Sequence, residues 1–268
     1  MKKFLFSLLA AGVLVLMVNH TLEAGSKKES GTLLTVGATP VPHAELLHLI
    51  RHDLAAQGIT LKVVEFTDYV QPNTALLHGD LDANFFQTQP YLDSHHEWSG
   101  KLVSVFGVHI EPFGLYSSKY EDVNDIPDGA VIAIPNDPNN GGRALLLLQA
   151  KGIIILRNGA GLEANIRDIT ANPRNFRFRE LEAAQLPRSL QDVDAACING
   201  NYALGVGLHP LRDSLIIEGA ESPYINIVVV RKGMENDPRI IALESALRSQ
   251  KVKDHITGFY KGDIAPIF

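Results

Sequence analysis

The chain has 268 residues, of which 46% are hydrophobic and 20% are charged, and its formal net charge is −6. These values are typical of a globular protein with a substantial core, and the negative balance without a basic stripe argues against a nucleic-acid-binding surface. The single cysteine, Cys197, excludes an intramolecular disulfide, so the stability of the fold has to come from its core.

The N-terminus is predicted to be a secretory signal. Lys2 and Lys3 precede the apolar run 4–18, which is too short for a comfortable transmembrane span and is typical of a signal peptide. We expect a signal peptide at 1–24 and a flexible tether at 25–31, and therefore an exported, periplasmic protein. No cysteine follows the apolar run, so the lipid attachment point of a bacterial lipoprotein is missing. Either an uncleaved signal anchors the chain or the chain is released.

The first elements after the tether form a βαβ unit. Residues 32–38 and 61–66 have the pattern of buried strands, and a helix with apolar residues at helical spacing lies between them and ends at Gly58. Such a unit implies parallel strands. A short helix at 75–78 and a strand at 82–86 are expected next.

Residues 130–149 predict a strand, a polar turn and a helix, which together can build a ligand site. Asp137 can cap the helix, and Pro138 suits its first turn. A helix N-terminus has unpaired N–H groups and a partial positive charge, and Arg143 adds a guanidinium that can bind a carboxylate or a phosphate. A capped helix with a surface arginine explains the same residues, so this alternative stays open here.

Two long extended segments, 102–117 and 223–231, are each long enough to pass from one domain to another. Two crossovers indicate two lobes, which we assign to 32–115 plus 228–268 and to 116–227. The predicted fold class is α/β, with two lobes that are each a mostly parallel sheet flanked by helices, and with a ligand in the cleft between them.

Within the second lobe we expect a helical segment after Gly161 and strands at 176–181 and 194–198. The last of these strands ends in an Asn-Gly-Asn turn at 199–201, which can present amides into a cleft. Loops that follow parallel strands lie at the same edge of a sheet. The loops expected to converge there are 67–73, 85–91, 135–143 and 199–201.

Five segments carry a resemblance to a known family. They are VGATPVPHAE at 36–45, FTDYVQPN at 66–73, ANFFQTQPYLD at 83–93, IPNDPNNGGRALLLLQ at 134–149 and INGNYAL at 198–204. In this order, over nearly the whole mature chain, the sequence resembles the methionine-binding, NlpA-type substrate-binding proteins of ABC importers. The resemblance implies a periplasmic-binding-protein fold that captures free methionine by hinge closure and delivers it to a membrane permease and its ATPase.

The resemblance also implies roles for single residues. Arg143 corresponds to the carboxylate-binding arginine of the family, and Asn201 and Asn226 correspond to polar clamps on the amino-acid backbone. The side-chain pocket corresponds to Tyr69, Phe86, Tyr91 and His109, with Thr88 at a position where the family commonly has histidine. Aromatic walls suit a thioether, which is apolar and polarizable. The threonine leaves one pocket contact in doubt, and the missing cysteine leaves the lipid anchor in doubt.

Other interpretations of the same residues stay open. Taken alone, Tyr69 and Phe86 are typical core aromatics, and His109 lies in alternating apolar sequence where a histidine is often a packing residue. Cys197 is the basis of an enzyme hypothesis, but its apolar neighbours indicate a buried strand, so we predict no enzymatic activity. The same fold would also serve a protein that binds another small amino acid, or a surface receptor without a transport role.

His43, His95 and His96 suggest a metal site at first sight. They lack partners at ligand spacing, so we expect solvated histidines, no metal and no cofactor. The remaining expectations concern partners. We expect no nucleic acid, a monomer, and membrane association through the N-terminus or through the permease.

Overall fold

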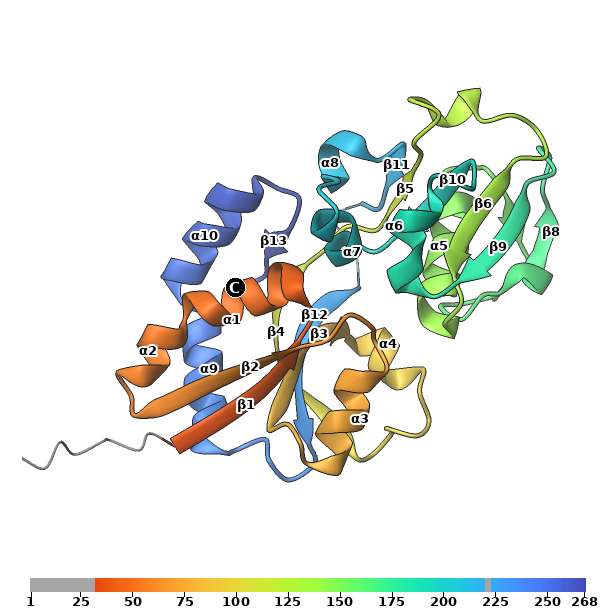
Figure 1. Ribbon diagram of the computed structural model, residues 1–268. Helices are drawn as coiled ribbons and strands as arrows, with labels where there is room; N and C mark the ends of the chain where they lie inside the picture. The colour runs from red at the N-terminus through yellow and green to blue at the C-terminus, as the bar shows by residue number, and fades with distance from the viewer. Residues whose placement is uncertain (1–31, 220–222) are drawn as a thin grey trace, which may run out of the picture.

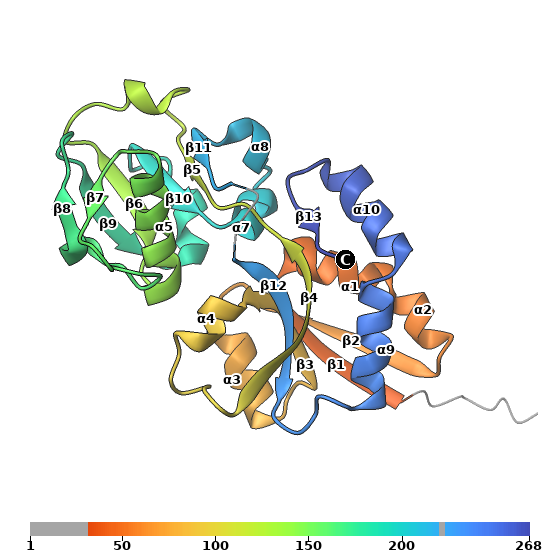
Figure 2. The ribbon, with the colours of Figure 1, turned by 180° about the vertical axis from the view of Figure 1, so that it is seen from behind.

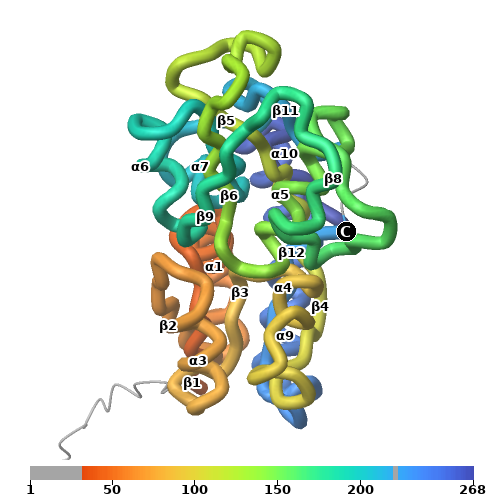
Figure 3. Tube along the Cα trace, turned by 90° about the vertical axis from the view of Figure 1, so that its right-hand side faces the viewer, coloured from red at the N-terminus to blue at the C-terminus, as the bar shows by residue number. Residues whose placement is uncertain are grey.

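The computed structural model describes residues 32–219 and 223–268. The predicted signal peptide and tether therefore lie outside the described residues. These residues form two main β-sheets, each with its own helices, and a separate two-stranded sheet (Figure 1). Viewed from the side, the elements of the first sheet lie below those of the second (Figure 3). In the described part of the chain, no helix is long and apolar enough to cross a membrane.

The first sheet has six strands in the order β13-β4-β12-β3-β1-β2. Their bounds are β1 Thr32–Ala38, β2 Ile59–Glu65, β3 Ala83–Thr88, β4 Leu102–Ile110, β12 Ile225–Arg231 and β13 Ala265–Pro266. β1 pairs in parallel with β2 and β3, which confirms the predicted βαβ unit. β12 lies antiparallel between β3 and β4.

Helices cover both faces of this sheet. One face is covered by a single helical turn at Pro40–Ala44, α1 Glu45–Leu49, α2 Arg51–Ala55, α9 Pro238–Leu247 and α10 Gln250–Tyr260. The other face carries α3 Gln71–His78 and α4 Gln89–Asp93. The alternation of β3 divides its side chains between the two cores, since Phe85 packs in the first and Phe86 in the second.

The second sheet has five strands in the order β11-β5-β10-β6-β9. Their bounds are β5 Gly114–Tyr116, β6 Val131–Pro135, β9 Arg177–Leu181, β10 Ala195–Ile198 and β11 Ile216–Ile217. α5 Pro138–Ala150 packs on one face, and α6 Leu186–Ser189 and α7 Gly200–Gly205 pack on the other. The smaller elements are the pair β7 Ile155–Leu156 and β8 Ile169–Ala171, the helix α8 Pro210–Asp213, and single turns at Val123–Asp125, Ile166–Asp168 and Ala183–Gln185.

The chain passes between the sheets twice. β4 ends at Ile110 in the first sheet and β5 begins at Gly114 in the second, and the return path lies between Ile217 of β11 and Ile225 of β12 (Figure 2). The predicted two-lobed α/β fold is confirmed. The sheets are mixed rather than mostly parallel, because the strands that follow each crossover return antiparallel to their neighbours.

One predicted element is wrong. The segment after Gly161 was expected to be helical, but it contains only one short turn at Ile166–Asp168 and the strand β8, which pairs with β7 from before this glycine. Gly159 and Gly161 both have positive φ, which breaks the backbone out of the helical region. Leu156 and Ala164 fill the α5 side of the core from this ribbon and loop instead.

Candidate functional site

The end of β3 and the start of α4 build an aromatic wall. Phe86 is the fourth residue of β3, and Tyr91 lies in α4 directly after the strand. Tyr69 completes the wall, with its ring centroid 5.8 Å from Phe86 and 5.7 Å from Tyr91. Burial raises the pKa of both tyrosines, so their phenols are neutral donors. The Tyr91 hydroxyl donates to the backbone oxygen of Tyr69 over 3.0 Å, which fixes the two rings relative to each other.

Arg143 comes from α5, whose start the sequence predicted correctly. The Asp137 side chain caps the helix by accepting from the Asn140 backbone amide, and Pro138 is the first residue. Arg143 is only 4% exposed, which excludes the surface-arginine alternative. Its Nε donates to Oε1 of Glu218 over 2.7 Å and its Nη2 donates to Oε2 of Glu218 over 2.5 Å.

This bidentate pair was not predicted. The Arg143 guanidinium also lies over the Tyr224 ring at 4.0 Å and donates from Nη2 to the backbone oxygen of Glu111 over 3.0 Å. Within the described residues no hydrogen bond engages Nη1. Two N–H groups therefore remain for a ligand, in a guanidinium whose orientation the protein has already fixed.

Side-chain amides supply the polar part of the second lobe. Asn201 lies in the first turn of α7, and the Tyr69 hydroxyl of the first lobe donates to its Oδ1 over 2.5 Å. Nδ2 of Asn199 donates to Oδ1 of Asn140 over 2.8 Å. Asn140 is therefore more than the turn-forming residue that the sequence suggested, because its side chain also lines the cavity described below.

The first lobe contributes a third amide, Asn226, from β12. In the sheet it lies between Thr88 of β3 and His109 of β4. Oδ1 of Asn226 lies 3.0 Å from Nε2 of His43, which reaches it from the turn before α1. His43 is fully buried, so the expectation that it is solvated was wrong. His96 is exposed, and His95 is half-buried and stacked on Trp98.

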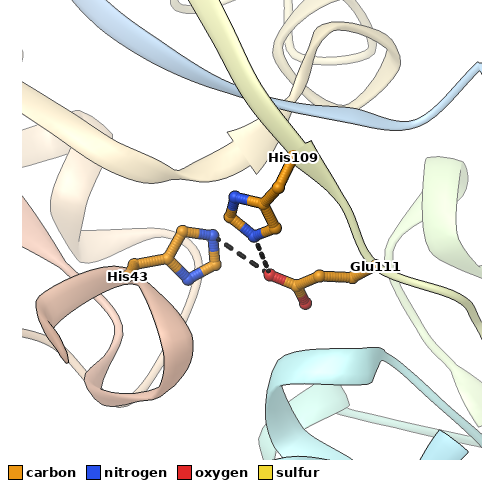
Figure 4. Close-up of side chains that lie close together, drawn as sticks. All are labelled: His43, His109 and Glu111. Atoms are coloured by element: carbon orange, nitrogen blue, oxygen red, sulfur yellow. Dashed lines mark hydrogen bonds and ion pairs between the residues drawn. The ribbon is translucent and has the colours of Figure 1, made fainter. Parts of the chain in front are cut away.

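Glu111 is a site residue that sequence reasoning missed. It lies on the first crossover, is 5% exposed, and its Oε1 is 2.8 Å from Nε2 of His109 and 3.3 Å from Nε2 of His43 (Figure 4). Burial raises the pKa of this carboxyl group, and His43 and Arg143 act against that shift. The available signal was the sequence His-Ile-Glu-Pro at 109–112, which places a histidine and a carboxylate on the same side of an extended chain.

The three side chains His43, His109 and Glu111 have the composition of a metal site. Burial lowers the pKa of His43 to about 4 and that of His109 to about 3, so both rings are neutral at neutral pH. Both Nε2 atoms face carboxylate or amide oxygens at hydrogen-bond distance, which requires an N–H at each Nε2 rather than a free lone pair. The arrangement is therefore a hydrogen-bonded network around Glu111 and not a set of metal ligands.

These elements enclose one cavity between the lobes. Its lining residues are Tyr69, Phe86, Gln87, Thr88, Tyr91, Glu111, Asn140, Arg143, Asn199, Gly200, Asn201 and Asn226. The structure thus brings seven of the eight predicted site residues to a single cavity. His109 does not line it, because its ring turns toward Glu111 and packs edge-on against Phe85 at 5.5 Å.

The cavity combines features that suit a zwitterion with an apolar tail. Arg143 and Glu111 place opposite charges on it, four asparagines add neutral donors and acceptors, and the aromatic wall forms the apolar part. Cys197 lies elsewhere, fully buried in β10, and burial raises the pKa of its thiol. A buried, protonated thiol is a poor nucleophile.

Comparison with known proteins agrees with this picture. The model of the family described as NlpA lipoprotein matches residues 34–268. Membrane lipoprotein TpN32 of Treponema pallidum is 46% identical over 86% of this chain and 87% of its own.

Two solved structures are similar in fold. A nutrient binding protein from Burkholderia cenocepacia bound to methionine superposes with a TM-score of 0.84 and 45% identity, covering 88% of this chain and 100% of its own. An ABC transporter periplasmic substrate-binding protein from Coxiella burnetii superposes with a TM-score of 0.82 and 42% identity, covering 87% of this chain and 99% of its own. Both of these relatives are described as binding proteins.

Proposed function

The chain belongs to the NlpA lipoprotein family, and from this membership we propose that it is the substrate-binding protein of an ABC importer for free methionine. The observation that carries the proposal is the composition of the interlobe cavity, in which an arginine, a carboxylate and an aromatic wall face one another. The methionine bound by the relative from Burkholderia cenocepacia supports the choice of ligand.

Each part of methionine has a partner in the proposed complex. The carboxylate binds Nη1 of Arg143 and the amides of Asn201 and Asn226, and the ammonium group binds Glu111. The thioether lies against Tyr69, Phe86 and Tyr91, and Thr88 forms part of the same wall. Sulfur–aromatic contacts and burial of the side chain stabilise this end of the ligand.

Hinge closure is the proposed mechanism of capture. The proposed hinge consists of the two crossovers, which lie between Ile110 and Gly114 and between Ile217 and Ile225, close to the lobe boundaries at 115/116 and 227/228 expected from the sequence. The hydroxyl of Tyr69 donates to Asn201 across the lobes, and that of Tyr202 donates to the backbone oxygen of Thr67 over 3.1 Å. Such bonds form only when the lobes are together, so they favour the closed state.

The partners follow from this mechanism. The closed protein presents methionine to a membrane permease with its ATPase, on the outer side of the inner membrane. We propose a monomer that associates with the membrane through its N-terminus or through the permease. Small-angle scattering tests closure directly, because saturating methionine should make the ligand-stripped protein more compact, and an unchanged profile contradicts the hinge.

The decisive test of the ligand class is the identity of the small molecule that co-purifies with the protein. Denaturation should release unmodified methionine in about equimolar amount, identified by mass spectrometry after chiral separation. Release of a different amino acid would retain the binding role and replace the ligand. Conversion of added methionine into a product would overturn the proposal, since a binding protein returns its ligand unchanged.

A further inference from the structure

Two buried histidines behind the cavity have no contact with the ligand in the proposed complex, yet both contact groups that do. We infer that His43 and His109 are positioning residues, which hold Glu111 as an acceptor and Asn226 as a donor, and so make the site specific for ligands with a free α-ammonium group. The inference rests on the proposed function, since it concerns how the same cavity selects its ligand.

His109 has little freedom of movement. It is fully buried on β4, its ring lies edge-on to Phe85 with an interplanar angle of 87°, and the His43 ring lies 5.1 Å away. Its Nε2 is fixed 2.8 Å from Oε1 of Glu111 (Figure 4). A neutral imidazole can serve this oxygen only as an N–H donor, because a carboxylate offers no proton in return.

His43 links the two ligand-facing groups. Its Nδ1 lies 2.8 Å from the hydroxyl oxygen of Thr39, which can donate to it, and this arrangement places the ring proton on Nε2. That N–H faces Oδ1 of Asn226 at 3.0 Å and Oε1 of Glu111 at 3.3 Å. With Oδ1 engaged by His43, the NH₂ group of Asn226 is the end left for the cavity that this residue lines.

The charges around Glu111 leave its carboxylate without a cationic partner of its own. Both histidines are neutral donors, and the backbone amide of Asn201 adds a third hydrogen bond. The guanidinium of Arg143 contacts the backbone oxygen of Glu111, while Glu218 takes its bidentate face. The phenols of Tyr69 and Tyr260, which also interact electrostatically with the Glu111 carboxylate, are neutral.

The consequence is that the cavity presents a negatively charged acceptor at Glu111 and a neutral donor at Asn226. Oriented neutral donors stabilise the ionised form of Glu111 without cancelling its charge, so the charge remains available to an ammonium group. Asn226 is held with its donor toward the position of the ligand carboxylate. A ligand without the ammonium leaves a desolvated carboxylate unpaired, which costs affinity steeply. The site should therefore reject des-amino and N-acylated analogues of its amino acid.

The test compares methionine with 4-(methylthio)butanoate, which is methionine without its amino group. Calorimetric titrations of both ligands at pH 7.5 are made on the ligand-stripped full chain and on three variants. In His109→Gln the side-chain amide can place an N–H near the former Nε2, in His109→Leu this donor is lost, and His109→Asn is polar but too short to reach Glu111. Thermal melts without ligand, and binding of the des-amino ligand itself, report that each variant is folded.

We expect wild-type protein to prefer methionine by about a hundredfold or more, as a charge-assisted pair in a buried site predicts. His109→Leu and His109→Asn should lower this ratio about tenfold by weakening methionine alone, and His109→Gln should restore it to within about threefold of wild type. Methionine affinity should fall at acid pH as Glu111 takes up a proton, and this fall is called the acid limb here. In His109→Leu the acid limb should lie at higher pH, because the Glu111 carboxylate loses a donor to its charged form. His43→Leu should lower the ratio in the same way.

Three results overturn the inference. If both ligands weaken equally in His109→Leu, the histidine is only a packing residue, and the same holds if the acid limb stays in place. If His109→Leu does not fold, the ratio in His109→Asn and His43→Leu decides in the same manner. A wild-type protein that binds neither ligand refutes the proposed function itself, whereas a wild type that binds methionine without discriminating against its des-amino analogue refutes only the role of this network.

Discussion

The pair formed by Arg143 and Glu218 allows the ligand-binding role of the arginine to be separated from its structural role. In Arg143→Ala the proposed complex loses the charged partner of the methionine carboxylate. A buried charge-assisted contact of this kind is worth about 2–4 kcal/mol, which corresponds to a roughly 30- to 1,000-fold higher Kd. The side chains of Arg143 and Glu218 are only 5% and 13% exposed, so solvent cannot replace the lost interaction fully.

The same substitution also acts on the ligand-free protein. It leaves the Glu218 carboxylate without its bidentate partner, and breaking a buried ion pair from one side costs about 3 kcal/mol of stability. The double variant Arg143→Ala/Glu218→Ala removes both charges, so most of this stability should return. Its affinity for methionine should stay as low as that of the single variant, because the carboxylate of the ligand still lacks the guanidinium.

The assays are urea denaturation without ligand and calorimetric titration with methionine, made on wild type, both single variants and the double variant. Near wild-type affinity in Arg143→Ala would refute the anchoring role. Recovery of affinity together with stability in the double variant would show that the arginine acts only through the fold.

Three further predictions test other parts of the site. Asn201→Ala and Asn226→Ala should each weaken methionine binding while the ranking of amino acids stays the same, and a changed ranking in competition titrations would refute their assignment to the amino-acid backbone. Burial raises the pKa of Glu111 above its ordinary value of 4.5, so methionine affinity should fall as pH is lowered through that raised pKa. Glu111→Gln should bind methionine weakly, and its affinity should not show this fall at acid pH. In the unfolded chain histidines take up protons near pH 6.5, whereas in the fold His43 and His109 stay neutral down to about pH 4 and pH 3. The free energy of unfolding should therefore fall as pH is lowered from 6.5 toward 4. A flat pH profile in urea denaturation would contradict the burial of these two rings in the neutral form.

The helical and strand pattern of the chain was strong enough to predict most of the fold. α5 was predicted from its Asp137 cap and its early proline, both of which are local signals. The βαβ unit at the start was equally clear from its periodicity. The prediction for the region after Gly161 was wrong because a few apolar residues near glycines fit a short helix and an irregular loop about equally well. Only the positive φ of Gly159 and Gly161 distinguishes the two.

The candidate site was predictable where it depends on local sequence or on the family resemblance, and not where it depends on distant partners. Nothing in the sequence indicates that Arg143 pairs with Glu218, 75 residues away. His43 meets Glu111 only because the turn before α1 and the first crossover lie side by side in the fold. The sequence His-Ile-Glu-Pro at 109–112 relates Glu111 to His109 but gives no sign of His43. The burial of this charge, and the two neutral rings that serve it, follow from the tertiary structure alone.

In the proposed complex, the cavity between the lobes binds free methionine through complementary charges at one end and aromatic rings at the other. Calorimetric titration of the ligand-stripped protein with methionine measures this binding without any intermediate step. We expect saturable binding at one site per chain, with methionine recovered unchanged and with thermal stability that rises with ligand concentration. No heat of binding and no thermal shift at millimolar methionine would contradict it.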